Sequence, residues 1–149
     1  MLSLGMDIGT STVKLVLLKN QEIEKQWMAV HHGNPFVCLK KGLSTLELAV
    51  DTPFSLCVTG SNTEALLEQD SAIPSLGDIP AIVEGVRWII PQVGSVIEIG
   101  SQGARFITDL QSRAPQFSVN EHCAGGTGSF FEDQMSRVGC RLGDYSSLV

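Results

Sequence analysis

Apolar and polar positions alternate along the first part of the chain and divide it into short strands. An apolar run over Leu2–Ile8 stops at Gly9 and resumes over Val13–Leu18, which predicts a strand, a tight turn and a second strand. Glu22–Val30 alternates loosely and predicts a third strand. Phe54–Val58 is a short apolar run, expected to add a parallel strand to this three-stranded meander.

Helical spacing of apolar residues predicts four helices between and after these strands. We expect them over Phe36–Leu48, Thr63–Gln69, Ala81–Ile90 and about Ser129–Val138. Gly42 weakens the first prediction, because glycine costs about 1 kcal/mol in a helix interior. Ile73–Pro80 contains proline and glycine and is expected to be a loop.

The opening pattern returns in the second half of the chain. Ser95–Ile107 is again a strand, a turn and a strand, with Glu98, Gly100 and Arg105 at the positions of Asp7, Gly9 and Lys14. Phe117–Asn120 predicts a further strand. We therefore expect a second meander followed by one helix, and we place the domains at residues 1–91 and 92–149.

The first turn carries the side chains of a phosphate-binding loop. Glycine lets the backbone approach a ligand closely, and successive turn amides form a concavity that binds anions. The residues concerned are Gly9, Thr10, Ser11, Thr12 and Lys14. Asp7 could hold Mg²⁺ through water beside the phosphate. The alternative is a β-hairpin with a polar turn and a surface acid.

Two further glycine turns follow predicted strands. Gly60 ends the fourth strand, where α/β proteins often place ligands, although an ordinary loop is an equal alternative. The last predicted helix is preceded by a glycine-rich loop of four residues, Gly125, Gly126, Thr127 and Gly128. The N-terminal amides of a helix favour an anion at this place. Cys123 precedes this loop, where the thiolate form is favoured, although an isolated cysteine is usually a small buried residue. His31 and His32 are interpreted as a polar loop pair rather than a metal site.

Composition narrows the class of protein. The chain has 149 residues, of which 43% are hydrophobic, and this is enough for a core. The net charge of −6 and the lack of a basic cluster argue against nucleic-acid binding. No apolar run is long enough to span a membrane, and no signal peptide is evident, so we expect a cytoplasmic protein with reduced cysteines. Cys38 and Cys57 are expected in the core.

Four segments of the chain, taken in order, resemble one family. They are Asp7–Lys14, Val58–Ser61, Ile97–Gln102 and Asn120–Glu132, the last containing Cys-Ala-Gly-Gly-Thr-Gly-Ser-Phe. Together they look like the ATPase activators of 2-hydroxyacyl-CoA dehydratases and the ATPase subunits of benzoyl-CoA reductase. The resemblance implies an α/β fold of the actin/Hsp70/sugar-kinase type, with two ribonuclease-H-like domains. This chain would hold the first domain and the start of the second.

The same resemblance implies the chemistry. ATP and Mg²⁺ would lie in a cleft, with Asp7, Glu98 and Gln102 as catalytic residues. The nucleotide phosphates would contact the first turn, Gly60, a second phosphate loop with Gly100 and Ser101, and the loop Gly125–Gly128. Cys123 would bind a [4Fe-4S] cluster shared across a homodimer, and ATP hydrolysis would drive an electron from it to a dehydratase-type partner.

The chain departs from the family in its second phosphate loop and in its length. Glu98 replaces the usual aspartate and Gly103 replaces an acid, which leaves hydrolysis in question. The family's adenosine-binding part and second cluster cysteine lie beyond Val149, and Cys140 is too close to Cys123 to be that ligand. We therefore expect this piece alone to be inactive, to bind ATP weakly or not at all, and to hold no stable cluster. The alternatives are a non-catalytic nucleotide-binding or scaffolding module, and a small-molecule kinase of the same fold.

Overall fold

The computed structural model describes residues 1–48, 51–101, 103–120, 127–141 and 143–144. The chain separates into two compact units, Met1–Ile82 and Val83–Val149. The functional domains expected at 1–91 and 92–149 stay a prediction.

The first unit is built on the predicted four-stranded sheet. Its strands are β1 (Leu2–Ile8), β2 (Thr12–Lys19), β3 (Glu22–Val30) and β4 (Phe54–Thr59), in the order β3-β2-β1-β4. β1, β2 and β3 form an antiparallel meander, and β4 pairs with β1 in parallel. The predicted meander and its parallel extension are therefore confirmed.

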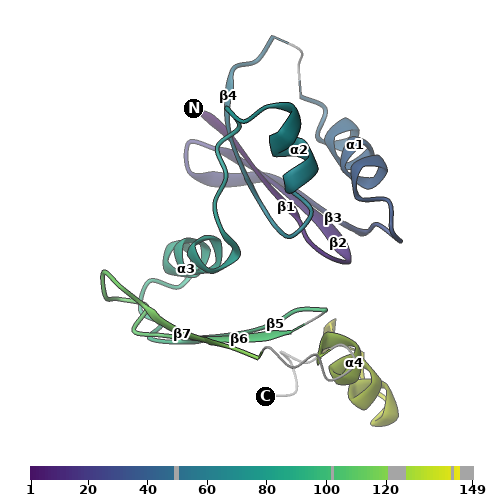
Figure 1. Ribbon diagram of the computed structural model, residues 1–149, viewed down its shortest axis with the longest axis vertical. Coiled ribbons are helices and arrows are strands. Elements are labelled where there is room, and N and C mark those ends of the chain that lie inside the picture. The colour runs from purple at the N-terminus through teal and green to yellow at the C-terminus, as the bar shows by residue number, and fades with distance from the viewer. Residues whose placement is uncertain (49–50, 102, 121–126, 142, 145–149) are drawn as a thin grey trace. The chain divides into compact units, whose positions relative to one another are not determined.

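Two helices cover one face of this sheet (Figure 1). They are α1 (Pro35–Leu46) and α2 (Glu64–Gln69), close to their predicted bounds. Strand residues at every second position face them, because successive side chains in a strand point to opposite faces. The buried core of the unit consists of Leu4, Met6, Ile8, Val13, Leu15, Leu17, Leu39, Leu46 and Val58.

The loop expected at Ile73–Pro80 is wrong at its C-terminal end, where its last three residues are helical. Pro74–Leu76 runs beside β4, where Val58 N–H donates to the Pro74 carbonyl and Leu76 N–H donates to the Val58 carbonyl, each at 2.9 Å. Helix α3 (Asp78–Ile89) then begins three residues before the expected start at Ala81. Pro80 is tolerated because the first turn of a helix has no intrahelical partner for its N–H groups.

The second unit contains the predicted second meander. β5 (Val96–Ile99), β6 (Ala104–Thr108) and β7 (Gln116–Val119) are antiparallel in the order β5-β6-β7, and α4 (Thr127–Arg137) follows. Ile107, Leu110 and Met135 are buried here. Arg87 fixes the β6–β7 connection to α3, because its guanidinium donates to the carbonyls of Leu110 and Ser112, each at 2.6 Å.

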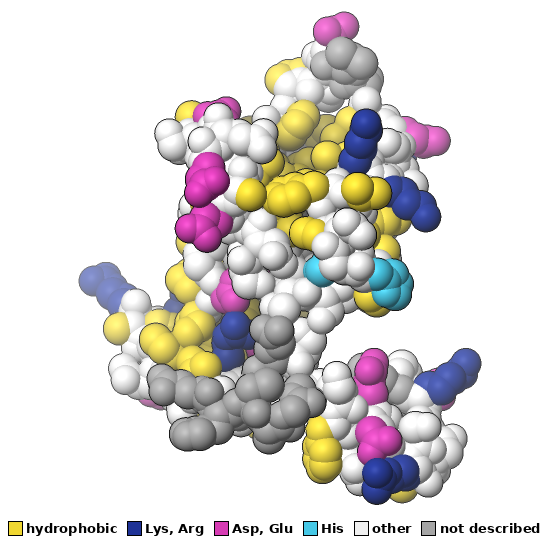
Figure 2. Space-filling view, turned by 45° about the vertical axis from the view of Figure 1, so that its right-hand side comes forward, with side chains coloured by type: hydrophobic (Ala, Val, Ile, Leu, Met, Phe, Trp, Pro, Cys, Tyr) yellow, Lys and Arg dark blue, Asp and Glu magenta, His cyan; other side chains and the backbone are white. Residues whose placement is uncertain are grey.

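The expected core position of Cys57 is wrong. Leu56 and Val58 point to the helices, so Cys57 between them lies on the opposite, exposed face of β4. Cys38 is half-buried. Large hydrophobic side chains are also exposed in both units, among them Met28, Val37, Ile97 and Phe117, and Figure 2 shows such side chains at the surface. No helix in the described part of the chain is long and apolar enough to cross a membrane.

Candidate phosphate-binding site

The turn between β1 and β2 consists of Gly9, Thr10 and Ser11 and is closed by a backbone hydrogen bond. Gly9 N–H donates to the Thr12 carbonyl at 3.0 Å, and β1 and β2 pair on either side of it. Asp7 and Lys14 are direct partners across the two strands, and Lys14 Nζ lies 2.6 Å from Asp7 Oδ2. The carboxylate and the ammonium therefore flank the turn as an ion pair.

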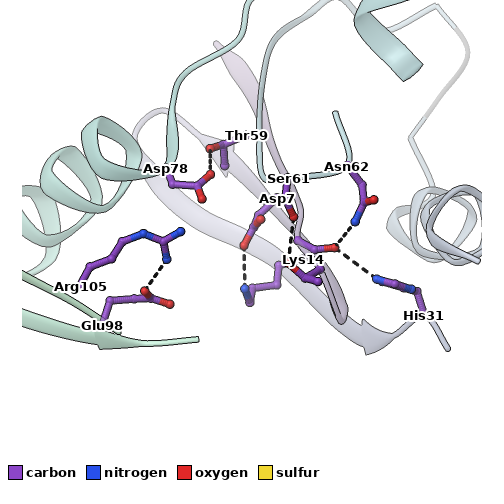
Figure 3. A network of polar contacts seen from close by, with 11 residues as sticks. Asp7, Lys14, His31, Thr59, Ser61, Asn62, Asp78, Glu98 and Arg105 are labelled. Carbon is purple, nitrogen blue, oxygen red and sulfur yellow. Dashed lines mark hydrogen bonds and ion pairs between the residues drawn. The ribbon is translucent and has the colours of Figure 1, made fainter. Parts of the chain in front are cut away.

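The carbonyl of Gly9 is held by two side chains from distant parts of the chain. His31 Nε2 lies 3.2 Å from this oxygen, and Asn62 Nδ2 donates to it at 2.7 Å. Figure 3 shows the His31 and Asn62 side chains converging on one oxygen. His31, buried to 8% exposure, thus supports the turn and is more than the polar loop residue we expected.

Hydrogen bonding at the His31 ring defines which nitrogen donates. Gly33 N–H donates to Nδ1 at 3.1 Å, so Nδ1 carries no proton. The ring nitrogen that faces Gly9 is therefore the protonated one, and Nε2–H is the donor. The backbone on either side is also fixed, because His31 N–H donates to the Ser11 carbonyl at 3.0 Å.

The turn after β4 lies directly against this first turn. Because β4 is parallel to β1, the carboxyl ends of both strands lie at the same edge of the sheet. Asn62 N–H donates to the Ile8 carbonyl at 2.9 Å, and the hydroxyls of Thr10 and Ser61 are 3.0 Å apart. Gly60 makes the approach possible, since a Cβ there would lie 2.5 Å from the backbone of Ile8 and 2.7 Å from Asp7 Oδ1.

The second hairpin repeats the geometry of the first. Gly100 N–H donates to the Gly103 carbonyl at 2.8 Å, as Gly9 does to Thr12. Glu98 and Arg105 are direct cross-strand partners, with Arg105 Nη1 2.6 Å from Glu98 Oε2. The two hairpins therefore share the sequence pattern, the hydrogen bond that closes the turn and the cross-strand ion pair.

The second turn also contacts the start of α4. Gly128 N–H donates to the Gly100 carbonyl at 3.0 Å, and a Cβ on Gly128 would lie 2.7 Å from that oxygen. Ser101 and Thr127 are partly buried, and the Thr127 hydroxyl is buried without a partner among the described residues. Gln102, Cys123, Gly125 and Gly126 lie outside the described residues, so their expected roles stay predictions.

The first turn has the donors that a phosphate needs. Among the described residues, no acceptor takes a hydrogen bond from the backbone N–H of Thr10 or Ser11. An anion can therefore be bound here by the backbone amides and hydroxyl groups of Thr10 and Ser11, together with the ammonium of Lys14. Asp7 Oδ1 is not the oxygen that bonds Lys14, so it fits the expected contact with hydrated Mg²⁺. No cluster of three or more His, Cys, Asp or Glu side chains in the described ranges could hold a metal directly.

We expect the Asp7–Lys14 ion pair to add little to folding stability. Both side chains are substantially exposed, Lys14 to 49% and Asp7 to 32%, and ion pairs of this kind contribute about 1 kcal/mol or less. Asp7→Asn and Lys14→Met should each change the free energy of unfolding in urea by no more than Lys19→Met, the control on the same strand. A loss several times larger would mean that the pair holds the hairpin together.

The structure has the α/β fold of the actin/Hsp70 type, as expected. A crystal structure of the ethanolamine utilization protein EutJ from Carboxydothermus hydrogenoformans shares it with a TM-score of 0.55 at 17% identity, covering 79% of this chain and 52% of that one. No family model matches the chain.

The resemblance to the dehydratase activators is confirmed by sequence and by structure. The chain is 32% identical over 143 residues to the 2-hydroxyisocaproyl-CoA dehydratase activator of Clostridioides difficile, covering 93% of this chain and 52% of that protein. It is 29% identical over 143 residues to the activator of lactoyl-CoA dehydratase of Anaerotignum propionicum, covering 93% and 54%. The structure of the Clostridium difficile activator, solved with bound ADPNP, has a TM-score of 0.75 at 26% identity and covers 99% of this chain and 56% of that one. The chain thus spans about half the length of the curated relatives it matches.

Proposed function

We propose that this chain is the phosphate-binding part of an ATP-dependent activator of a 2-hydroxyacyl-CoA dehydratase or a related CoA-ester reductase. The observation that carries the proposal is the repeated turn geometry in a chain similar to such activators. Both turns are closed by a glycine amide, at 3.0 and 2.8 Å, and both are flanked by a cross-strand acid–base pair. The acid–base pair is not needed to close a hairpin.

The proposal gives a part to residues of both turns. The amides and hydroxyls of Thr10 and Ser11 bind a terminal phosphate, and Lys14 neutralises its charge. Asp7 holds Mg²⁺ through water. Glu98 and Gln102 orient the attacking water at the second turn, so that ATP and water give ADP and inorganic phosphate. Gly60 and Gly128 leave room for the backbones that carry these groups.

The phosphate part of the proposal can be tested on this chain with pyrophosphate and Mg²⁺. We expect the backbone amide signals of Thr10 and Ser11 to shift in nuclear magnetic resonance spectra. Lys14→Met should weaken pyrophosphate binding about fivefold, which is about 1 kcal/mol for one charge near a surface phosphate. Lys19→Met, at the far end of the same strand, is the matched control and should leave the affinity unchanged. Shifts confined to residues outside Gly9–Thr12 would contradict the proposal.

Nucleotide affinity should be low for the chain by itself. Phosphate contacts alone should not supply the roughly 8 kcal/mol that micromolar binding needs once the costs of association are subtracted. Titration of the chain with MgADPNP in a calorimeter should therefore give no sub-micromolar affinity. Tight binding would show that this chain also holds the adenosine.

The redox part of the proposal rests on Cys123. A [4Fe-4S] cluster needs four cysteine ligands, and a homodimer that supplies two from each subunit would meet that number. When bound, the cluster would supply one electron to the dehydratase-type partner, with a low-potential electron-carrier protein as the source. One Cys123 from each copy of this chain gives only two ligands, so the chain alone should hold no stable cluster.

Alkylation of the native protein at neutral pH tests the environment of Cys123. We expect Cys123 to react faster than Cys38, which is half-buried beside the carbonyls of Ala29 and Val30. Cys57 is exposed and is not a valid comparison, so the measurement uses Cys57→Ser protein with mass-spectrometric mapping. Faster labelling of Cys38 would make Cys123 an ordinary buried residue.

A non-catalytic nucleotide-binding module is the second candidate. Gly103, where the family usually carries an acid, favours it, because the second turn then offers one carboxylate, Glu98, and this already bonds Arg105. The two candidates differ in turnover. An activator should hydrolyse ATP when the remainder of the fold is present, whereas a non-catalytic module should bind ATP without releasing phosphate.

A further inference from the structure

The orientation of one peptide group decides whether the first turn attracts or repels an anion. In a planar trans peptide the C=O and N–H bonds point in opposite directions. The Gly9 carbonyl and the Thr10 N–H belong to the same peptide group. If that carbonyl is fixed toward the protein, the Thr10 N–H points away from it; if the peptide turns over, a carbonyl oxygen takes its place.

The structure fixes this peptide by its oxygen. Asn62 Nδ2 lies 2.7 Å and His31 Nε2 lies 3.2 Å from the Gly9 carbonyl, and these residues are 53 and 22 positions away along the chain. The preceding amide is tied as well, because Gly9 N–H bonds the Thr12 carbonyl. Two side-chain donors on one turn carbonyl exceed what a β-hairpin requires for the closure of its turn.

The two donors are themselves anchored. The His31 ring is oriented by Gly33 N–H, which donates to Nδ1 and leaves the proton on Nε2. The main chain of Asn62 donates to the Ile8 carbonyl at 2.9 Å, one residue before Gly9. Both side chains therefore reach the Gly9 oxygen from backbone positions that are fixed beside the same turn.

We propose that His31 and Asn62 are positioning residues for phosphate binding: they hold the Gly9 carbonyl so that the Thr10 N–H faces the anion. They do not touch the phosphate. The inference rests on the proposed phosphate-binding function and adds two residues to it, both outside the turn itself. It also requires a proton on His31 Nε2, because only a protonated Nε2 can donate to the Gly9 carbonyl.

Paired variants of His31 separate positioning from general support of the fold. In His31→Gln the side-chain amide nitrogen reaches the place of Nε2, so the donor to Gly9 is kept. In His31→Asn the amide reaches only the place of Nδ1, so this donor is lost. Asn62→Leu removes the second donor at similar size and without a change of charge.

The experiment is a pyrophosphate titration of the full chain, followed by the Thr10 and Ser11 amide signals. We expect His31→Asn and Asn62→Leu each to weaken binding fivefold or more, and His31→Gln to stay within twofold of the unaltered chain. The urea midpoint of each variant shows whether it is folded. Ring nitrogen shifts of His31 should show a protonated Nε2 and an unprotonated Nδ1, and the Gly9 carbonyl carbon shift should move in both donor-less variants.

The outcomes distinguish the inference from the function on which it rests. If the unaltered chain shows no amide shifts with pyrophosphate, the proposed function fails, and the inference with it. If the unaltered chain binds pyrophosphate and both His31→Asn and Asn62→Leu bind it equally well, only the inference is overturned. An unprotonated His31 Nε2 would overturn the inference for His31 whatever the affinities are.

Discussion

Replacing Gly60 with alanine is expected to lower the free energy of unfolding of the first unit by about 3 kcal/mol. Two costs add. Gly60 has φ of +104°, which is strained for any residue with a Cβ, and the new methyl group would lie 2.5 Å from both the carbonyl carbon and the oxygen of Ile8. Backbone atoms within a sheet cannot move aside as a flexible side chain does. Urea unfolding followed by far-ultraviolet circular dichroism measures the change.

Gly33→Ala is the matched control for this prediction. Gly33 also has positive φ, at +84°, but no atom lies within 4 Å of a Cβ built on it. Its replacement should cost only the backbone strain, about 1 kcal/mol. If the two variants lose equal stability, the turn after β4 is not pressed against β1 as the structure shows. In Gly60→Ala we also expect weaker pyrophosphate binding, because Asn62 and Ser61 move with Gly60.

The strands of both units could be predicted because their signals are local. The bounds of β1 and β3 agree with the apolar alternation, and the repeated acid-x-Gly pattern located the second hairpin. Successive strand residues face opposite sides of the sheet, and this alternation predicts which side chains are buried. Cys57 was wrongly placed in the core because the alternation was not applied to β4. The early start of α3 was missed because Pro80 was taken as a loop residue, although a first helical turn accommodates proline.

The supports of the candidate site depend on tertiary pairing and were missed for that reason. Nothing local to His31 indicates a bond to Gly9. A three-stranded meander, however, brings the end of its third strand next to the first turn, and Val30 indeed pairs with Thr12. The same reasoning applies to Asn62, since a strand parallel to β1 must end beside it. Polar residues within the first three positions after β3 and β4 were therefore predictable neighbours of the turn.

Gly42→Ala is expected to lower the free energy of unfolding, although alanine has a higher helix propensity than glycine. Alanine normally stabilises a helix interior relative to glycine by about 1 kcal/mol. In α1, however, a Cβ at position 42 would lie 2.5 Å from two ring carbons of Trp27 and 2.7 Å from Leu15 Cδ1. Leu15 has no exposed surface and cannot move aside within the core, whereas the Trp27 ring is partly exposed but rigid. Overpacking of this kind costs about 3 kcal/mol, which leaves a net loss of about 2 kcal/mol.

Gly85→Ala tests the same substitution in a helix without that contact. Gly85 lies inside α3, and no atom is within 4 Å of a Cβ built on it. This variant should gain up to about 1 kcal/mol. Urea unfolding by circular dichroism compares the two, and Trp27 fluorescence in a Trp88→Phe background reports on the first unit alone. A loss of stability in Gly42→Ala with a gain in Gly85→Ala would show that the close packing of α1 on β2 and β3 requires Gly42. A gain of stability in both variants would mean that α1 lies further from the sheet.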